Sequence, residues 1–400
     1  MHYLIAFDKF KGAATAEKAC FLAGEAIATA DPSATVERVP LTDGGEGFAT
    51  ILANALEGEL REIEVTGPRF RPVKGKLALV GAGRIPEPAW ARLRLPEAVR
   101  NGTIGVVEMA SASGYECIGE DERDPWETTS YGTGQLIRAA VEAGASAILL
   151  GIGGSATNDC GAGALEALGV SYYDRDLQAV TGVTPSRFKL INTAGSTSHL
   201  VDSFPPLRIA CDVDNPLVGP NGATRVFGPQ KGLKPDQSEQ MERAIHKMGC
   251  RILGLFGKIP SEWDSLMMEP GSGAAGGIGF ALRHALPEAS FVDGFPLVAE
   301  LLALKDKLAA ADRVLTGEGR LDKTSLSGKG PVSLLKMAPE GKAVLMFCGR
   351  IDPSVAESLQ ECYPALELIA VSDPSWPLEK ALAQTAMSLQ RAVTNALSSR

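Results

Sequence analysis

Short runs of consecutive apolar residues alternate along the chain with segments whose apolar residues recur every three or four positions. Residues 3–7 form a continuous apolar run, which predicts a buried strand. One helical face follows at Ala19, Leu22, Ala23 and Ala26, so a helix is expected from about Thr15. The same reasoning predicts strands at 35–39, 62–66, 146–152, 313–315, 343–347 and 366–371, and helices at 296–310 and from Pro331.

Strand and helix alternate in this way at both ends of the chain, which favours an α/β fold. A chain of 400 residues also exceeds what a single core usually fills. We therefore predict two domains. A discontinuous, Rossmann-like or flavodoxin-like α/β domain with a doubly wound parallel sheet comprises residues 1–66 plus 290–400. An inserted α/β domain with a mixed sheet comprises residues 67–289.

The composition is that of an ordinary soluble globular protein, with 45% hydrophobic and 22% charged residues. A formal net charge of −9 argues against a general surface for nucleic acid or anionic membrane, so neither is an expected partner. Seven scattered cysteines without a C-x-x-C pair indicate a reducing compartment. With no signal peptide or long apolar span in the sequence, we expect a cytoplasmic protein.

The segment 146–163 reads as a buried strand, a polar glycine loop and a helix. Gly153 and Gly154 leave backbone N–H groups near the helix start, which is a geometry that binds anions. Ser155, Asn158 and Asp159 add hydrogen-bonding side chains in close succession. The alternative is that the asparagine and the aspartate only cap the helix.

Two predicted strands of the first domain, at 3–7 and 35–39, also end in polar loops. Asp8, Lys9 and Lys11 follow the strand at 3–7, at the carboxyl end where open parallel sheets bind ligands. The two lysines, beside a glycine, suit a phosphate or a carboxylate, and the alternative is a solvated surface turn. Asp43 and Glu46 follow the strand at 35–39, where they either hold Mg²⁺ or cap a helix.

The middle of the chain supplies a second group of candidates. Asp212 and Asp214 occupy alternate positions at a predicted strand end, so they would project the same way as a general base and a metal ligand. The alternative is a pair of exposed surface acids. Gln230 and Lys231 lie in a predicted tight turn, and the glycine-rich run 271–279 offers a phosphate cradle at Gly276 and Gly277.

The last candidates lie in the C-terminal third. Glu318 and Arg320 follow the predicted strand 313–315, and Lys329 lies between two glycines before the helix at Pro331. No Gly-Lys pair is followed by Ser or Thr, so the chain has no P-loop. Residues 151–156 match the loose dinucleotide pattern G-x-G-x-x-A, which leaves open an NAD-linked oxidoreductase acting on a hydroxy acid.

Taken together, these motifs resemble the type I glycerate kinases. They occur in order from residue 1 to about 350: Asp8-Lys-Phe-Lys-Gly12, Asp43-Gly-Gly-Glu-Gly47, Tyr131-Gly-Thr-Gly134, Gly153-Gly-Ser-Ala-Thr-Asn-Asp159, Cys211-Asp-Val-Asp-Asn-Pro-Leu217, Phe227-Gly-Pro-Gln-Lys-Gly232, Gly273-Ala-Ala-Gly-Gly277 and Thr316-Gly-Glu-Gly-Arg-Leu-Asp322. The resemblance implies phosphorylation of D-glycerate, typically to 2-phosphoglycerate, with ATP and Mg²⁺. It also implies two domains that close on an active-site cleft between them.

Within this resemblance the candidate residues take the following expected roles. The expected catalytic residues are Asp212, Asp8 and Lys11, with Asp212 accepting the proton of the glycerate hydroxyl. The expected substrate- or phosphate-binding residues are Lys9, Gly153, Gly154, Ser155, Asn158, Asp159, Gln230, Lys231, Gly276, Gly277, Glu318, Arg320 and Lys329. The expected metal ligands are Asp43, Glu46 and Asp214.

The chain departs from the family pattern at three places. Lys9 replaces a usual serine, Cys160 replaces a usual glycine, and the excursion at 81–101 is longer than the usual hairpin. Besides the oxidoreductase, a non-catalytic regulator that binds an acid or a nucleotide stays open as an alternative. The expected partners are D-glycerate and ATP, and assembly as a homodimer is left open.

Overall fold

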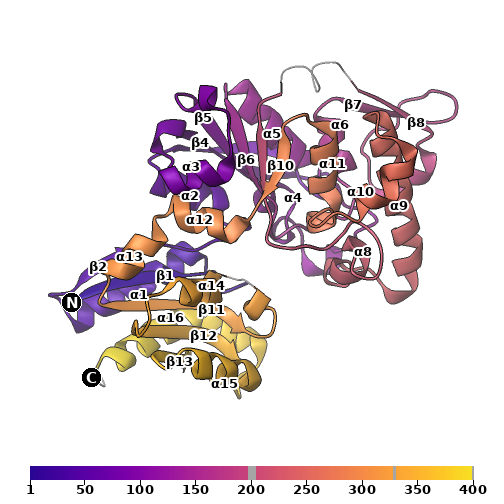
Figure 1. The fold of residues 1–400 in the computed structure, drawn as a ribbon. Helices are drawn as coiled ribbons and strands as arrows, with labels where there is room; N and C mark the ends of the chain where they lie inside the picture. Colours follow the sequence, from indigo (N-terminus) through magenta and orange to yellow (C-terminus); the bar gives the residue numbers. More distant parts are fainter. Residues whose placement is uncertain (197–203, 328–329, 399–400) are drawn as a thin grey trace. The chain divides into compact units, whose positions relative to one another are not determined.

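The chain divides into two compact units. The computed structural model describes residues 1–196, 204–327 and 330–398 (Figure 1). Unit 1 comprises Met1–Asp43 and Val298–Arg400, and unit 2 comprises Gly44–Leu297. One unit is thus built from both chain ends. The predicted α/β class is confirmed, with a parallel sheet in unit 1 and a mixed sheet in unit 2.

Unit 1 contains a five-stranded sheet in the order β13-β12-β11-β1-β2, and every neighbouring pair in it is parallel. The chain moves outward from the centre in both directions, since β1 leads to β2 on one side and β11 leads to β12 and β13 on the other. The strands are β1 (His2–Phe7), β2 (Thr35–Arg38), β11 (Arg313–Leu321), β12 (Val344–Ile351) and β13 (Leu366–Ala370).

Right-handed crossovers in opposite directions place helices on both faces of such a sheet. On one face, Tyr3, Ile5 and Phe7 of β1 pack in a single cluster with buried residues of the first and last helices. The oxygen of Thr15 accepts a hydrogen bond from the N–H of Lys18 and so caps the first helix. The helices of unit 1 are α1 (Ala16–Ala30), α13 (Leu304–Ala310), α14 (Gly330–Met337), α15 (Pro353–Cys362) and α16 (Leu378–Ser398).

Unit 2 contains a six-stranded sheet in the order β10-β9-β6-β5-β4-β3. Strands β10, β9, β6 and β5 are parallel, whereas β4 is antiparallel to both β5 and β3. The strands are β3 (Glu59–Thr66), β4 (Pro72–Gly81), β5 (Thr103–Glu108), β6 (Ala147–Gly151), β9 (Leu207–Ala210) and β10 (Ala289–Val292). A small antiparallel pair, β7 (Val170–Tyr173) and β8 (Thr193–Ser196), lies apart from this sheet.

Helices cover the mixed sheet and share one large apolar core with it. Helices α2 (Phe48–Ala55) and α5 (Tyr131–Glu142) both contact strands β3, β4 and β5. The helices of unit 2 are α2 (Phe48–Ala55), α3 (Glu87–Leu93), α4 (Met109–Ser113), α5 (Tyr131–Glu142), α6 (Ala162–Ala167), α8 (Ala223–Phe227), α9 (Ser238–Leu255), α10 (Trp263–Met267) and α11 (Ile278–Ala285). Helix α12 (Gly294–Leu301) runs from unit 2 into unit 1.

The observed boundaries fall at 43/44 and 297/298 and not at the predicted 66/67 and 289/290. The reason is β3, which we assigned to the first domain. It pairs with β4 along its whole length, from Glu59 opposite Leu79 to Thr66 opposite Pro72, and therefore belongs to the mixed sheet. Two element predictions also need correction. The helix expected at 296–310 is two helices, broken at Ala303 with φ 49°, and β11 continues six residues beyond the predicted strand end, to Leu321.

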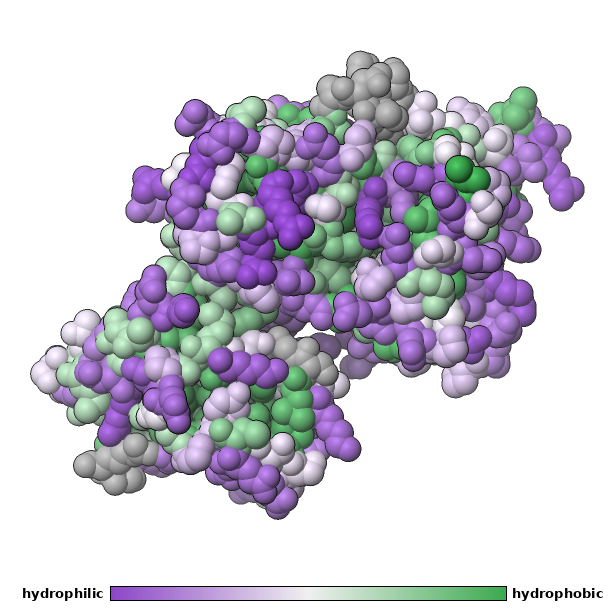
Figure 2. Space-filling view, viewed as in Figure 1, coloured by the Kyte–Doolittle hydropathy of each residue, from purple (hydrophilic) through white to green (hydrophobic). Residues whose placement is uncertain are grey.

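Hydrophilic side chains are spread over the visible face of each unit, with smaller apolar areas between them (Figure 2). Among the described residues, no helix combines the length and the apolar character needed to cross a membrane.

Candidate active site

A cavity of about 430 Å³ opens in unit 1 at the carboxyl ends of its central strands. Strands β1 and β11 lie side by side there, and the chain leaves them toward opposite edges of the sheet. This reversal is the position at which open parallel sheets bind ligands. The cavity is lined by Asp8, Lys9, Phe10, Lys11, Ala13, Asp43, Glu318, Gly319, Arg320, Asp322, Gly349, Arg350, Ser372, Leu378, Ala381, Leu382 and Thr385.

Six residues that the sequence singled out meet in this cavity although they come from three distant segments. They are Asp8, Lys9, Lys11, Asp43, Glu318 and Arg320. Sequence reasoning missed Arg350 and the wall formed by the start of α16. Arg350 directly follows Gly349 near the end of the predicted strand 343–347, and this strand-exit position was the available signal. The residues of α16 gave none, because a helix lines a cavity only through tertiary packing.

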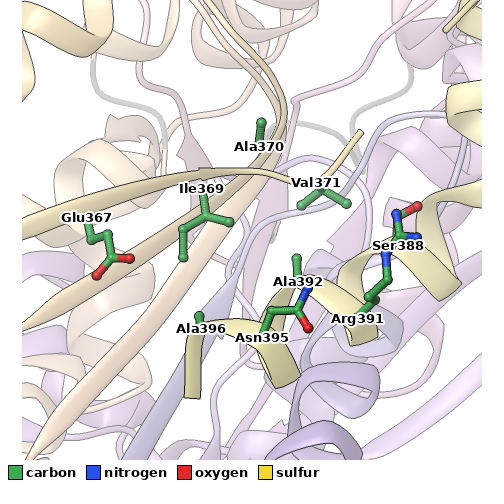
Figure 3. Close-up of a pocket in the computed structure, with 9 residues that line it drawn as sticks. All are labelled: Glu367, Ile369, Ala370, Val371, Ser388, Arg391, Ala392, Asn395 and Ala396. Carbon is green, nitrogen blue, oxygen red and sulfur yellow. The ribbon is translucent and has the colours of Figure 1, made fainter. Parts of the chain in front are cut away.

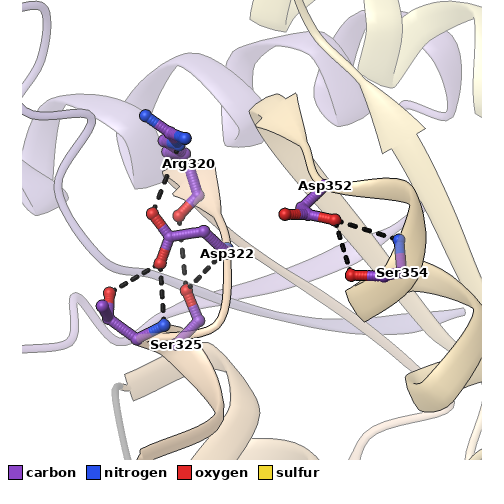
Figure 4. Close-up of polar contacts among 6 residues, drawn as sticks. Arg320, Asp322, Ser325, Asp352 and Ser354 are labelled. Carbon is purple, nitrogen blue, oxygen red and sulfur yellow. Dashed lines mark hydrogen bonds and ion pairs between the residues drawn. The ribbon is translucent and has the colours of Figure 1, made fainter.

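The charged rim of the cavity is held by local hydrogen bonds (Figure 4). The Nε of Arg320 lies 3.2 Å from an oxygen of Asp322, and the other oxygen of Asp322 accepts hydrogen bonds from the backbone and hydroxyl of Thr324. The N–H of Lys9 donates to Asp8 at 2.6 Å. These contacts fix the loops, while the side chain of Arg320 stays largely exposed.

In unit 2, candidate residues gather at the corresponding edge of the mixed sheet. Strands β5, β6 and β9 are parallel neighbours, so the loops that follow them share one edge. The loop after β6 carries Gly153 to Asp159, and the loop after β9 carries Asp212 and Asp214. Glu108, the last residue of β5, is buried and accepts a hydrogen bond from the N–H of Ala49 at the start of α2.

Asp159 is fully buried, and its carboxylate is surrounded by protein donors. One oxygen accepts bonds from the N–H and the hydroxyl of Ser130, both at 2.7 Å, and from the N–H of Gly163. The other accepts from the N–H of Gly161. Burial raises the pKa of this carboxyl, although the four hydrogen bonds act in the opposite direction. Asp159 thus caps the starts of α5 and α6, which is the capping arrangement that the sequence left open.

Lys231 is also buried, at 2% exposure, and its ammonium group reaches into the loop after β6. It donates to the hydroxyl of Ser155 at 3.0 Å and to the carbonyl of Thr157 at 2.6 Å. Burial lowers the pKa of Lys231 to about 7, with the nearby Asp159 carboxylate opposing that shift. Its backbone lies in a short 3₁₀ helix, Pro229–Lys231, and not in the predicted tight turn.

The glycines predicted as a phosphate cradle in unit 2 serve close packing. A Cβ on Gly276 would lie 2.2 Å from the carbonyl oxygen of Thr157, and one on Gly277 would lie 2.9 Å from the Cα of Cys160. The N–H of Cys160 donates to the carbonyl of Gly276 at 2.8 Å. Glycine at these positions lets two loops lie directly against each other.

Two side chains of the same loop are completely buried. The amide nitrogen of Asn158 donates to the hydroxyl of Thr224 at 3.2 Å, while its oxygen and the hydroxyl of Thr157 have no hydrogen-bond partner. Cys160, where the family resemblance led us to expect glycine, takes a left-handed φ of 52°. A non-glycine residue in that region is strained by about 1 kcal/mol, so the departure noted in the sequence has a local cost.

The two acids after β9 do not lie on a strand. Strand β9 ends at Ala210, and Asp212 and Asp214 follow in irregular structure, so the predicted alternation does not apply. Both are exposed. One oxygen of Asp212 accepts a hydrogen bond at 2.8 Å from the N–H of Phe295, in the first turn of α12.

The predicted metal ligands are distributed over both units, with Asp43 in unit 1 and Glu46 and Asp214 in unit 2. Within residues 1–196, 204–327 and 330–398, no group of three or more histidines, cysteines or acids has a geometry that would hold a metal ion. Gln230 is exposed. Lys329 lies outside the described residues.

A second hollow of unit 1, about 460 Å³ in volume, lies between β13 and α16 (Figure 3). Its lining is mostly alanine and aliphatic, with Glu367, Arg391 and Asn395 as its longer polar side chains. None of the residues predicted for the site lines it, and we assign it no function.

Comparison with known proteins decides the family. The model of the glycerate kinase family matches residues 3–399. The chain belongs to the glycerate kinase family. It is 34% identical over 394 residues to a glycerate kinase of Bacillus subtilis, covering 98% of this chain and 95% of the relative. It is 35% identical over 358 residues to the glycerate 2-kinase of Escherichia coli, covering 89% and 87%.

Solved structures agree with this family. A crystal structure from Salmonella typhimurium LT2, described as glycerate kinase 2, matches with a TM-score of 0.71 and 32% identity, over 100% of this chain and 98% of that one. The family resemblance drawn from the motifs is therefore confirmed. The comparisons give no support to an oxidoreductase or a non-catalytic regulator.

Proposed function

We propose that this chain transfers the terminal phosphoryl group of ATP to a hydroxyl of D-glycerate, giving 2-phosphoglycerate. The observation that carries this proposal is the match to the glycerate kinase family along nearly the whole chain. The relative in Escherichia coli is named a glycerate 2-kinase, which supports the position of transfer. A cytoplasmic location and a homodimer stay predictions.

Phosphoryl transfer requires positioning and charge neutralisation more than covalent help from the protein. The cavity of unit 1 offers both, because Lys9, Lys11 and Arg320 line it together with Asp8. We propose that the cations offset phosphate charge and that Lys11 stabilises the charge that develops during transfer. Asp8 supplies a carboxylate beside them and fixes the loop through the N–H of Lys9.

Carboxylates in the same cavity suit Mg²⁺, which prefers oxygen ligands and usually retains several waters. One or two carboxylates usually hold this ion together with waters and phosphate oxygens, and Asp8 and Asp43 offer such carboxylates in the cavity of unit 1. Bound there, it would neutralise phosphate charge. The roles of Glu46 and Asp214 as metal ligands stay predictions.

We assign the acid substrate to the loop after β6 in unit 2. Gly154 is exposed with a left-handed backbone, and Ser155 follows it with its hydroxyl fixed by Lys231. Backbone N–H groups and hydroxyls at this edge suit a carboxylate and adjacent hydroxyls. Asp212, exposed on the next loop of that edge, is the proposed base for the glycerate hydroxyl, since its carboxylate is steered by a backbone N–H and not buried.

Purified protein should release ADP when it is given ATP, Mg²⁺ and D-glycerate, and ³¹P NMR of the product should show 2-phosphoglycerate. Reactions with L-glycerate and without metal are the controls. A product phosphorylated at the 3-position would correct the position of transfer, and a lack of ADP release would contradict the kinase. Following nicotinamide absorbance with the same acid tests the oxidoreductase directly.

A further inference from the structure

The residues that line the cavity of unit 1 are of two chemical kinds. About half of them are charged, and the others include an apolar wall of Phe10 and Ala13 together with residues from the start of α16. Leu378, Ala381 and Leu382 provide the helical side of that wall. D-glycerate carries an oxygen on each of its three carbons and has no apolar surface to cover such a wall. A flat heteroaromatic base has that surface.

The charged lining residues include two arginines in register on adjacent strands. Arg320 of β11 and Arg350 of β12 are Cα partners in the parallel pairing, and both line the cavity. Like charges at neighbouring positions on two strands repel each other. One N–H of Arg350 donates to the carbonyl of Trp376, just before α16, and Arg320 pairs with Asp322. A ligand with several negative charges would relieve the remaining repulsion, and guanidinium groups bind phosphate oxygens in a bidentate manner.

Gly319 and Gly349 line the cavity without side chains, so a ligand can approach the backbone there. A Cβ on Gly349 would lie 2.4 Å from the carbonyl oxygen of Gly319, so glycine at 349 also lets the two strands lie against each other. The cavity also lies at the reversal of strand order, where α/β sheets of this kind take nucleotides. Its volume of about 430 Å³ falls within the range of small-molecule sites.

We propose that this cavity of unit 1 is the nucleotide site, with the adenine base against the wall of Phe10, Leu378 and Leu382 and the phosphates on Arg320 and Arg350. The assignment rests on the proposed kinase function for the identity of the nucleotide. Under this assignment unit 1 binds the nucleotide, and the polar loop after β6 in unit 2 binds the acid.

A substitution in the apolar wall tests the base-binding half. Leu378 is 59% exposed, so Leu378→Glu is expected to leave folding intact while placing a charge where the base would lie. Met387→Glu is the matched control, because Met387 is on the same helix, is 64% exposed and does not line the cavity. Titration calorimetry with ADP, without glycerate, should give a dissociation constant at least about tenfold higher for Leu378→Glu and an unchanged value for Met387→Glu.

A substitution in the arginine pair tests the phosphate-binding half. Arg350→Gln should weaken the binding of pyrophosphate about tenfold and leave the binding of adenosine within twofold. Leu378→Glu should have the opposite pattern, with the binding of adenosine weakened about tenfold and the binding of pyrophosphate within twofold of the unsubstituted value. Arg391→Gln is the control, since Arg391 is exposed in unit 1 and lines the other hollow. Thermal unfolding of each variant verifies that it is folded.

The outcomes separate the site from the function. ADP affinity that stays at the unsubstituted value in Leu378→Glu and Arg350→Gln, with turnover retained, overturns the nucleotide site and leaves the kinase intact. A raised KM for D-glycerate with unchanged ADP affinity also overturns it, because the cavity would then take the acid. ADP binding that responds to both substitutions in a protein that does not phosphorylate D-glycerate supports the site and contradicts the proposed function.

Discussion

Two loops of this chain use the same kinds of residue after parallel strands and fold into opposite environments. After β1 in unit 1, Asp8, Lys9 and Lys11 surround an open cavity. After β6 in unit 2, Asp159 is enclosed completely, and Lys231 reaches the same loop from a distant segment to donate to Ser155 and Thr157. Aspartate, lysine and glycine therefore line a binding cavity in one unit and hold the backbone in the other.

The difference shows what decides the role of a charged residue in a glycine loop. A carboxylate that accepts four protein hydrogen bonds, as Asp159 does, has little capacity left for a ligand. The Asp159 carboxylate instead fixes the starts of helices α5 and α6, and with them the backbone of the loop that contains Gly154. The cavity of unit 1 keeps Lys11, Arg320 and Arg350 exposed, where a ligand can reach them, although Asp8 in the same lining is buried.

Removal of the buried carboxylate should be the most damaging change to stability. Asp159→Ala leaves four buried donors without their acceptor, and we expect it to lower the free energy of unfolding by about 3–5 kcal/mol. The matched control is Asp352→Ala, which removes an exposed cap of α15 that accepts from the N–H and hydroxyl of Ser354 (Figure 4). That control should cost about 1 kcal/mol. Urea unfolding measures both, and equal losses would contradict the structural role of Asp159.

Loss of the proposed base should remove activity without removing stability. Asp212→Asn keeps an oxygen that accepts the N–H of Phe295, so the unfolding midpoint should stay the same. The kcat with D-glycerate should fall at least about 100-fold, as for loss of a general base. Asp214→Asn is the neighbouring control, and the affinity for ADP should be unchanged in both. Full turnover in Asp212→Asn would show that another group accepts the proton.

The buried lysine should make the stability of the protein depend on pH. Its pKa is lowered from 10.5 to about 7 on folding, so the unfolded chain binds more protons between these values. The free energy of unfolding should therefore gain a contribution from Lys231 as pH rises from about 7 toward 10, and this contribution is lost again as pH falls through 7.

Lys231→Met should remove that contribution and cost about 2 kcal/mol, because Ser155 and Thr157 lose their donor. Denaturant titrations at pH 7 and pH 9 compare its pH dependence with that of Lys9→Met, which changes a lysine of the open cavity. A pH dependence that survives in Lys231→Met would place the titration elsewhere.

The exposed ion pair at the cavity rim should contribute least. Asp322→Asn weakens the contact with Arg320, whose side chain is 71% exposed, and should change the free energy of unfolding by less than about 1 kcal/mol. Unfolding at low and high salt measures it, and the small difference from the unsubstituted protein should vanish at high salt. A loss as large as that of Asp159→Ala would remove the contrast between the two regions.

Much of this protein could be predicted from local pattern. Apolar runs located β1, β6, β12 and β13 to within about four residues, because buried parallel strands need continuous apolar side chains. The polar loop residues at strand ends located six members of the unit 1 cavity, because parallel strands place their carboxyl ends at one edge. The order of the motifs was specific enough to identify the family.

Local patterns and the order of the motifs thus specify the α/β class, the family and the residue types at the strand ends. Packing between distant segments determines which sheet contains β3, which carboxylate is enclosed and which arginine lines the cavity. The sheet that contains β3 is determined by its pairing partner, because the segment Glu59–Thr66 could extend either sheet and its pairing with β4 places it in the mixed sheet. Contacts between residues far apart in the chain decide the others: Ser130 with Asp159, Ser155 with Lys231, and Arg320 with Arg350. Burial and hydrogen bonding are properties of these distant neighbours and not of the local sequence.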